Sequence, residues 1–147
     1  MDILSPFQIA LSLLVSFEPE LMGIIGLSLG VSLTAVGISL VIGLPLGALL
    51  AAYRFPGRGA IIVISNTFLG MPPVVVGLVI YLLVSRAGPF GFLGILYTPA
   101  AMMLAQTILV LPIAIALSRQ VFEALNAEYA PLFRSIGLSQ FLSLIHI

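Results

Sequence analysis

Residues 66–77 of the chain read NTFLGMPPVVVG, with two adjacent prolines at Pro72 and Pro73. Arg58 and Arg86 enclose this stretch within 27 uncharged residues, and a helix needs about 20 apolar residues to cross a bilayer. On a helix that starts after Arg58, the prolines come about 20 Å along, near the bilayer centre. Backbone irregularity at that depth is tolerated where protein or a water-filled cavity satisfies the freed polar groups. The stretch therefore predicts a broken membrane helix, and it favours a pathway or gate over a purely structural kink.

The rest of the chain is equally poor in charge. Of its 147 residues, 61% are hydrophobic and 7% are charged, whereas a soluble domain carries about 25% charged residues. This composition, which includes no cysteine, excludes a soluble enzyme, a nucleic-acid-binding protein with a basic face and a disulfide scaffold. We predict an interfacial segment at 1–20 and three membrane spans near 27–53, 60–85 and 95–117.

The arginines predict the orientation of these spans, because cytoplasmic loops are enriched in Lys and Arg. Arg54 and Arg58 follow the first predicted span, and Arg119 and Arg134 follow the third. The opposite side carries only Arg86. The N-terminus is therefore predicted to lie outside, and the segment after the third span inside.

A few residues in the spans are small or polar. The glycines in each of the pairs Gly26/Gly30 and Gly43/Gly47 lie one helical turn apart, which lets another helix approach closely. The amides of Gln106 and Asn66 must either hydrogen-bond another helix or face water. Both alternatives, interhelical bonding and pathway lining, are open for these two side chains.

The chemistry of the spans limits the mechanism. They hold no charged residue of the kind that proton- or sodium-coupled transporters use, and no set of metal ligands. The only histidine is His146, and the absence of lysine excludes the phosphate-binding loop that ends in Lys-Ser/Thr. Uphill transport would therefore draw its energy from another chain, and a passive pore would fit the same pattern.

Residues 118–137 differ in composition from the predicted spans, since charges of both signs lie among their apolar side chains. The pattern predicts an amphipathic segment interrupted by Pro131. Mixed charge favours a protein partner over an anionic lipid surface.

Several of these stretches resemble a known family. Residues 31–47 look like the first core helix of type I ABC importer permeases. Residues 66–77 and 85–91 are similar to the oxyanion branch of that family, the tungstate and molybdate permeases. Residues 97–102 and 105–106, with the Leu-Pro-Ile at 111–113, lean toward the tungstate permeases. The resemblance covers about residues 26–140.

The resemblance implies an all-α, polytopic transmembrane bundle of the MetI-like permease fold, with the permease domain at 21–147. It implies no cofactor and no ATP hydrolysis by this chain, which would import a tetrahedral oxyanion, tungstate, across the cell inner membrane. The implied partners are a second permease copy, an ABC ATPase subunit and an extracytoplasmic oxyanion-binding protein, with the lipid bilayer around them and no nucleic acid. The implied pathway or gate residues are Asn66, Met71, Pro72, Pro73, Val76, Gly77 and Gln106.

The resemblance also implies an ATPase-coupling segment at 118–140, with Glu128, Pro131, Arg134 and Gly137 as its contact residues. The family pattern is E-A-A-x-x-x-G, and Gly137 matches its glycine. The sequence departs from the pattern at 131–133, which read Pro-Leu-Phe, so the glutamate is missing and Glu128 stands three residues before its position.

Such permeases continue into two further core spans, so we expect the reading frame to be truncated and 141–147 to be a foreign tail. Three alternatives are open. One is a molybdate or sulfate permease of the same family, another is a small non-transporting membrane scaffold, and the third is a passive pore.

Overall fold

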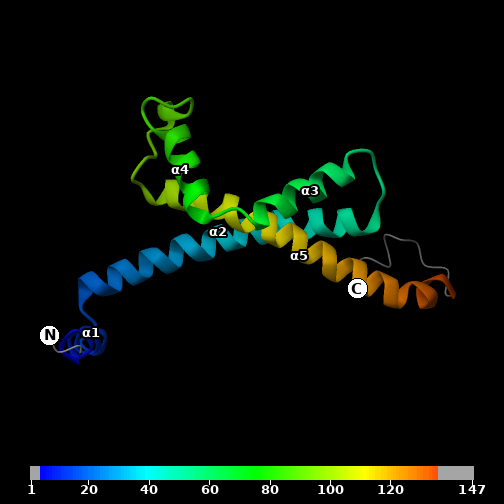
Figure 1. Cartoon of the computed structure of the whole chain (residues 1–147). Coiled ribbons are helices and arrows are strands. Elements are labelled where there is room, and N and C mark those ends of the chain that lie inside the picture. The colour runs from blue at the N-terminus through cyan, green and yellow to red at the C-terminus, as the bar shows by residue number, and fades with distance from the viewer. Residues whose placement is uncertain (1–3, 136–147) are drawn as a thin grey trace.

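The computed structural model describes residues 4–135 and contains helices and no strand over that range. The elements in chain order are α1 (Leu4–Val15), α2 (Pro19–Ala52), α3 (Arg58–Leu69), α4 (Pro73–Val84), the short 3-10 helix η1 (Gly91–Leu93) and α5 (Pro99–Ser135) (Figure 1). The all-α class predicted from the sequence is confirmed.

The two long helices, α2 and α5, form the centre of the structure. They contain 34 and 37 residues, so each extends over about 50 Å at 1.5 Å per residue. Each holds a stretch with a mean hydropathy of 2.2 and is long and apolar enough to cross a membrane. The two helices run in the same direction, and α3 runs back in the opposite one (Figure 1).

Small residues bring α2 and α5 close together. Ser39, Gly43 and Gly47 recur every four residues on α2, and all three are buried. A Cβ added to Gly43 would lie 2.7 Å from the Cβ of Ala114, and one added to Gly47 would overlap the Ser118 hydroxyl. The close helix approach predicted from the Gly43/Gly47 pair is therefore confirmed, and we call this contact the glycine seam.

Two hydroxyl groups fix the register of the glycine seam. Ser118 Oγ donates to the carbonyl of Ala114 on its own helix at 2.5 Å and lies 3.2 Å from the carbonyl oxygen of Gly43. Ser39 Oγ donates to the carbonyl of Thr107 at 3.4 Å. Residue numbers rise together along both helices at these contacts, which agrees with their parallel course.

The other glycine pair, Gly26/Gly30, lies in the part of α2 nearer the N-terminus. A Cβ added to either glycine would meet nothing within 4 Å, and the same holds for Gly37. A glycine spacing alone therefore does not decide where a helix packs. A facing helix must be present as well, and at Gly43 and Gly47 it is α5 with its small residues Ala114 and Ser118.

Helix α5 differs from the prediction. The sequence predicts a span near 95–117 and then a segment interrupted by Pro131, but α5 continues without a break to Ser135. The predicted interruption is wrong because a proline removes only one helix hydrogen bond, and the remaining bonds of a long helix keep it continuous. Pro99 is the first residue of α5, where its missing N–H costs nothing.

Helix α1 is separate from α2. Its 12 residues extend over about 18 Å, less than the roughly 30 Å of a bilayer core. Phe17 has a φ of 50° just after the end of α1. Pro19 is the first residue of α2. Figure 1 shows α1 turned away from the axis of α2. Its interfacial position stays a prediction.

Candidate functional site

The break at the double proline is the main irregularity among the apolar helices. Helices α3 and α4 contain 12 residues each, and their axes differ in direction by 106°. Pro72 is extended, with φ −60° and ψ 132°, and Pro73 is the first residue of α4. A proline disfavours the helical conformation in the residue before it and suits the first position of a helix. The broken helix predicted over 60–85 is therefore present, as two short helices that meet at Pro72.

Backbone hydrogen bonds form on both sides of this break, and on the α4 side the amide of Val75 donates to the carbonyl of Pro72 at 3.0 Å. The amide of Gly70 donates to the carbonyl of Thr67 at 3.2 Å, and that of Met71 donates to the carbonyl of Phe68 at 3.1 Å. These tight turns satisfy the last carbonyls of α3. On the α3 side, the carbonyls of Thr67 and Phe68 therefore have partners within the chain, as the interior of a membrane favours.

One face of α4 packs against α5. Val76, Ile80 and Val84, spaced four residues apart, are buried together, and Met71 and Ala105 are among the partly buried residues that pack against them. Of the predicted pathway residues, Val76 therefore lies in the contact between α4 and α5, and Met71 packs against the same apolar cluster. The other predicted residues of the break, Pro72, Pro73 and Gly77, are exposed.

The two amide side chains have no partner within the described chain. Asn66 is exposed on α3 and Gln106 is half-buried on α5, and neither side chain hydrogen-bonds another residue in the range 4–135. Their neighbours Thr67 and Thr107 instead donate to carbonyls one turn earlier in their own helices, at 2.8 and 2.7 Å. Within the described residues, both amides therefore keep their hydrogen-bonding groups unused.

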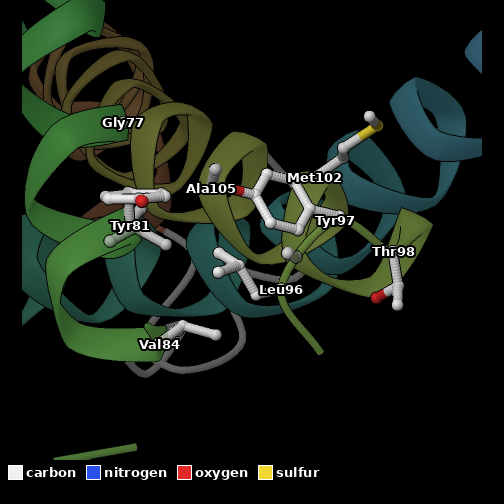
Figure 2. A pocket seen from close by; sticks show the side chains of 10 residues that line it. Gly77, Tyr81, Val84, Leu96, Tyr97, Thr98, Met102 and Ala105 are labelled. Carbon is white, nitrogen blue, oxygen red and sulfur yellow. The ribbon is translucent and has the colours of Figure 1, made fainter. Parts of the chain in front are cut away.

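A cavity of about 230 Å³ lies between α4, the loop before α5, and α5 itself. Its wall combines Gly77 and Tyr81 from α4 with Tyr97 from the loop and Ala105 from α5. Figure 2 shows the rings of Tyr81 and Tyr97 on two sides of this cavity. Of the predicted pathway residues, only Gly77 lines it. The sequence did not indicate the two tyrosines.

Tyr97 has an unusual backbone and an altered hydroxyl. Its φ of 64° is in the left-handed region, which residues other than glycine rarely adopt. Hydrogen bonding to Tyr81 raises the pKa of the Tyr97 hydroxyl above its usual value, and charge repulsion between the two groups adds to the effect. The Tyr97 hydroxyl therefore loses its proton less readily than an ordinary tyrosine hydroxyl does.

The far end of the helix bundle carries a cluster of three charges. The Glu123 carboxylate of α5 accepts from Arg58 Nη2 at 2.6 Å and from Arg119 Nη1 at 2.7 Å. Arg58 Nε also donates to the carbonyl of Leu50 at 2.7 Å. This charge cluster joins the last turns of α2, the start of α3 and α5. Only its Arg119–Glu123 half, four residues apart on one helix, has a signature in the sequence.

We expect Glu123→Gln to lower the free energy of unfolding by about 1–2 kcal/mol, because the substitution removes two charge-assisted hydrogen bonds and leaves two arginines facing each other. The side chains of Arg119 and Arg58 are 16% and 28% exposed, so solvent screens the loss only in part. Thermal unfolding of the purified chain in detergent measures it. Glu128→Gln, at an exposed position of the same helix, is the matched control; an equal loss in both variants would contradict a structural role of the charge cluster.

The predicted coupling residues lie toward the end of α5. Glu128 is exposed, Pro131 and Arg134 lie within the helix, and Gly137 lies outside the described residues. Over residues 4–135 no group of three or more metal-ligating side chains is present.

Comparison with known proteins identifies relatives of this chain. It is 36% identical over 131 residues to the tungstate uptake system permease protein TupB of Peptoclostridium acidaminophilum, a match that covers 89% of the chain and 58% of that protein. It is 40% identical over 108 residues to a probable anion ABC transporter permease protein of Haloferax volcanii, covering 74% of the chain and 47% of that protein. The sulfate transport system permease protein CysW of Escherichia coli K12 is 34% identical over 74 residues, half of this chain and 25% of its own.

The chain spans about half the length of the first two of these relatives. No protein-family profile matches it, and no solved structure matches it. The relatives and the apolar helices together indicate a multi-pass membrane protein. They confirm the resemblance that the motifs indicate: the chain is similar to the permease proteins of oxyanion ABC transporters, and most like those named for tungstate.

Proposed function

We propose that this chain is a permease subunit of an ATP-driven importer that carries tungstate across the cell inner membrane. The observation that carries the proposal is the similarity to a tungstate uptake permease over 131 residues. The broken helix at Pro72 supports it, because discontinuous helices within a membrane often mark a transport site. A sulfate permease is the second candidate, supported by the shorter match to CysW.

The exposed residues of the break would contact the passing anion or a second copy of the chain. Asn66, Pro72, Pro73 and Gly77 are exposed on α3 and α4, and the Asn66 and Gln106 amides have no partner in the described chain. A homodimer that closes around these residues would form the pathway. Val76, buried where α4 packs on α5, would hold the break in position, and Met71 packs against the same apolar cluster.

Energy would come from a separate ABC ATPase subunit, since the chain has no lysine for a phosphate-binding loop of its own. With the N-terminus outside, the charge cluster and the end of α5 lie on the cytoplasmic side. Glu128, Pro131, Arg134 and Gly137 would contact the ATPase there. An extracytoplasmic oxyanion-binding protein would deliver the anion on the opposite side, near Arg86.

Disruption of the coding sequence in its host cell tests this function. At tungstate concentrations that limit uptake, we expect cellular tungsten, measured by mass spectrometry, to fall about tenfold or more, as loss of a saturable high-affinity route requires. Sulfur and molybdenum contents should stay unchanged. A fall in sulfur uptake alone would indicate the sulfate permease, and unchanged levels of all three would favour a non-transporting scaffold.

A further inference from the structure

A second cavity lies beside the one that Gly77 lines. Its volume is about 430 Å³, and its wall includes Arg86, Gly91 and Gly94 from the loop between α4 and α5. The two cavities share Tyr81, Val84, Leu96 and Tyr97 as lining residues. A group bound beside Arg86 would therefore be separated from the Gly77 cavity by two tyrosines and two apolar side chains.

The charge at this cavity is positive and uncompensated. Arg86 is exposed, and it forms no ion pair with any residue in the range 4–135. The sequence holds no acidic residue between Glu20 and Glu123, and Glu123 is already held by Arg58 and Arg119. The planar guanidinium presents paired N–H donors that match two oxygens of a tetrahedral oxyanion.

The loop that carries Arg86 packs closely against the end of α4. A Cβ added to Gly88 would overlap the carbonyl of Leu82, and one added to Gly91 would lie 2.5 Å from the carbonyl oxygen of Ser85. The amide of Phe90 donates to the carbonyl of Leu83 at 2.9 Å, which ties the loop to the end of α4. This close packing restricts how far the loop can move and keeps Arg86 near the tyrosines.

Tyr97 contributes the third feature. Residues other than glycine that adopt a left-handed backbone often cluster at sites that bind ligands, and Tyr97, with a φ of 64°, lines both cavities. Its hydroxyl and that of Tyr81 are hydrogen-bonding groups on the cavity wall that also holds Arg86. Hydroxyl and guanidinium N–H groups can replace part of the hydration of a dianion, and Tyr97 would turn its single O–H from Tyr81 to the anion when it binds.

We propose that the cavity formed by Arg86, Tyr81 and Tyr97 is an oxyanion-binding mouth, which receives the tetrahedral dianion that the binding protein releases before the anion moves toward the helix break. The inference rests on the proposed function for the identity of the anion. It adds a binding site on the permease itself, at the end of the bundle opposite the charge cluster.

Tungstate binding to the full chain in phosphatidylcholine nanodiscs tests the mouth, by equilibrium dialysis with tungsten measured by mass spectrometry. We expect Arg86→Gln to weaken binding about tenfold to a hundredfold, the usual effect of removing a charged hydrogen-bond donor. Tyr97→Phe should weaken it less. Arg54→Gln, at an exposed arginine that lines neither cavity, should bind like the unaltered chain.

Several results would contradict the oxyanion-binding mouth. One is equal tungstate affinity of Arg86→Gln and the unaltered chain. Another is a loss of affinity in Arg54→Gln as large as in Arg86→Gln, because an equal loss would indicate unspecific charge attraction. Loss of tungstate binding when phosphatidylglycerol is added would assign Arg86 to a lipid headgroup instead. Disruption of the coding sequence could lower tungsten accumulation while Arg86→Gln leaves tungstate binding unchanged. That pair of results would reject the oxyanion-binding mouth and leave the proposed function standing. Circular dichroism of each variant confirms that its helices have formed.

Discussion

Replacing Gly47 by leucine is expected to separate α2 from α5 and lower the stability of the folded chain by about 3 kcal/mol or more. A Cβ at this position would lie 2.9 Å from the backbone nitrogen of Arg119 and would overlap the Ser118 hydroxyl. Backbone atoms of a helix cannot turn aside as a flexible side chain can, so the two helices must move apart. The polar contact between Ser118 and Gly43 would then be lost as well.

Gly37→Leu is the matched control for this substitution, since the same change is made on the same helix. A Cβ at Gly37 would meet nothing within 4 Å, and leucine favours a helix over glycine by somewhat under 1 kcal/mol. We therefore expect this variant to equal or slightly exceed the unaltered chain in thermal unfolding in detergent, followed by circular dichroism. Equal losses in Gly37→Leu and Gly47→Leu would show that helix propensity or lipid contact, and not the glycine seam, sets the stability.

The glycine seam shows what local sequence can predict about packing and what it cannot. A one-turn spacing of small residues appears in both glycine pairs, because it is a property of one helix. Only the pair at Gly43 and Gly47 packs, since Ala114 and Ser118 of α5 lie opposite it. The identity of the facing residues depends on the register between two helices, which a single sequence does not display.

The charge cluster and the end of α5 illustrate the same limit. Arg58 and Glu123 stand 65 residues apart, so no local pattern connects them, and the sequence indicated the arginines only as markers of orientation. At Pro131 the local rule gave the wrong answer. It counts the hydrogen bond that a proline removes, but it does not count the bonds on either side that keep the helix continuous.

The same limit applies to the candidate site, whose helix break is predictable from the sequence and whose cavities are not. The break at Pro72 and Pro73 is predictable, because the restriction that proline places on its neighbours is local and strong. The cavities beside it depend on how the loop before α5 returns to α4. That return requires a left-handed Tyr97, and tyrosine is not a residue type that signals such a turn.

The paired substitution Pro72→Ala with Pro73→Ala is expected to lower tungstate uptake about tenfold or more while the amount of protein in the membrane changes much less. Each exchange removes a penalty of about 3 kcal/mol against a continuous helix, which is roughly a hundredfold change in the ratio of straight to bent forms. A straight helix over 58–84 would carry Val76, Ile80 and Val84 off the surface of α5. The arrangement of Gly77 and the cavity beside it would be lost with them.

Two measurements separate a gating role of the break from a general loss of structure. The chain has no cysteine, so spin labels at Val63→Cys and Leu78→Cys, both at exposed positions, report the bend directly. Their backbone separation should rise toward about 22 Å, the value for a continuous helix, when both prolines are replaced. Pro45→Ala is the control, because Pro45 lies within α2, where the helix continues through it, and uptake should remain unchanged. If the labels move apart while uptake persists, the bend serves packing alone; if uptake falls with the label distance unchanged, the proline rings themselves contact the pathway.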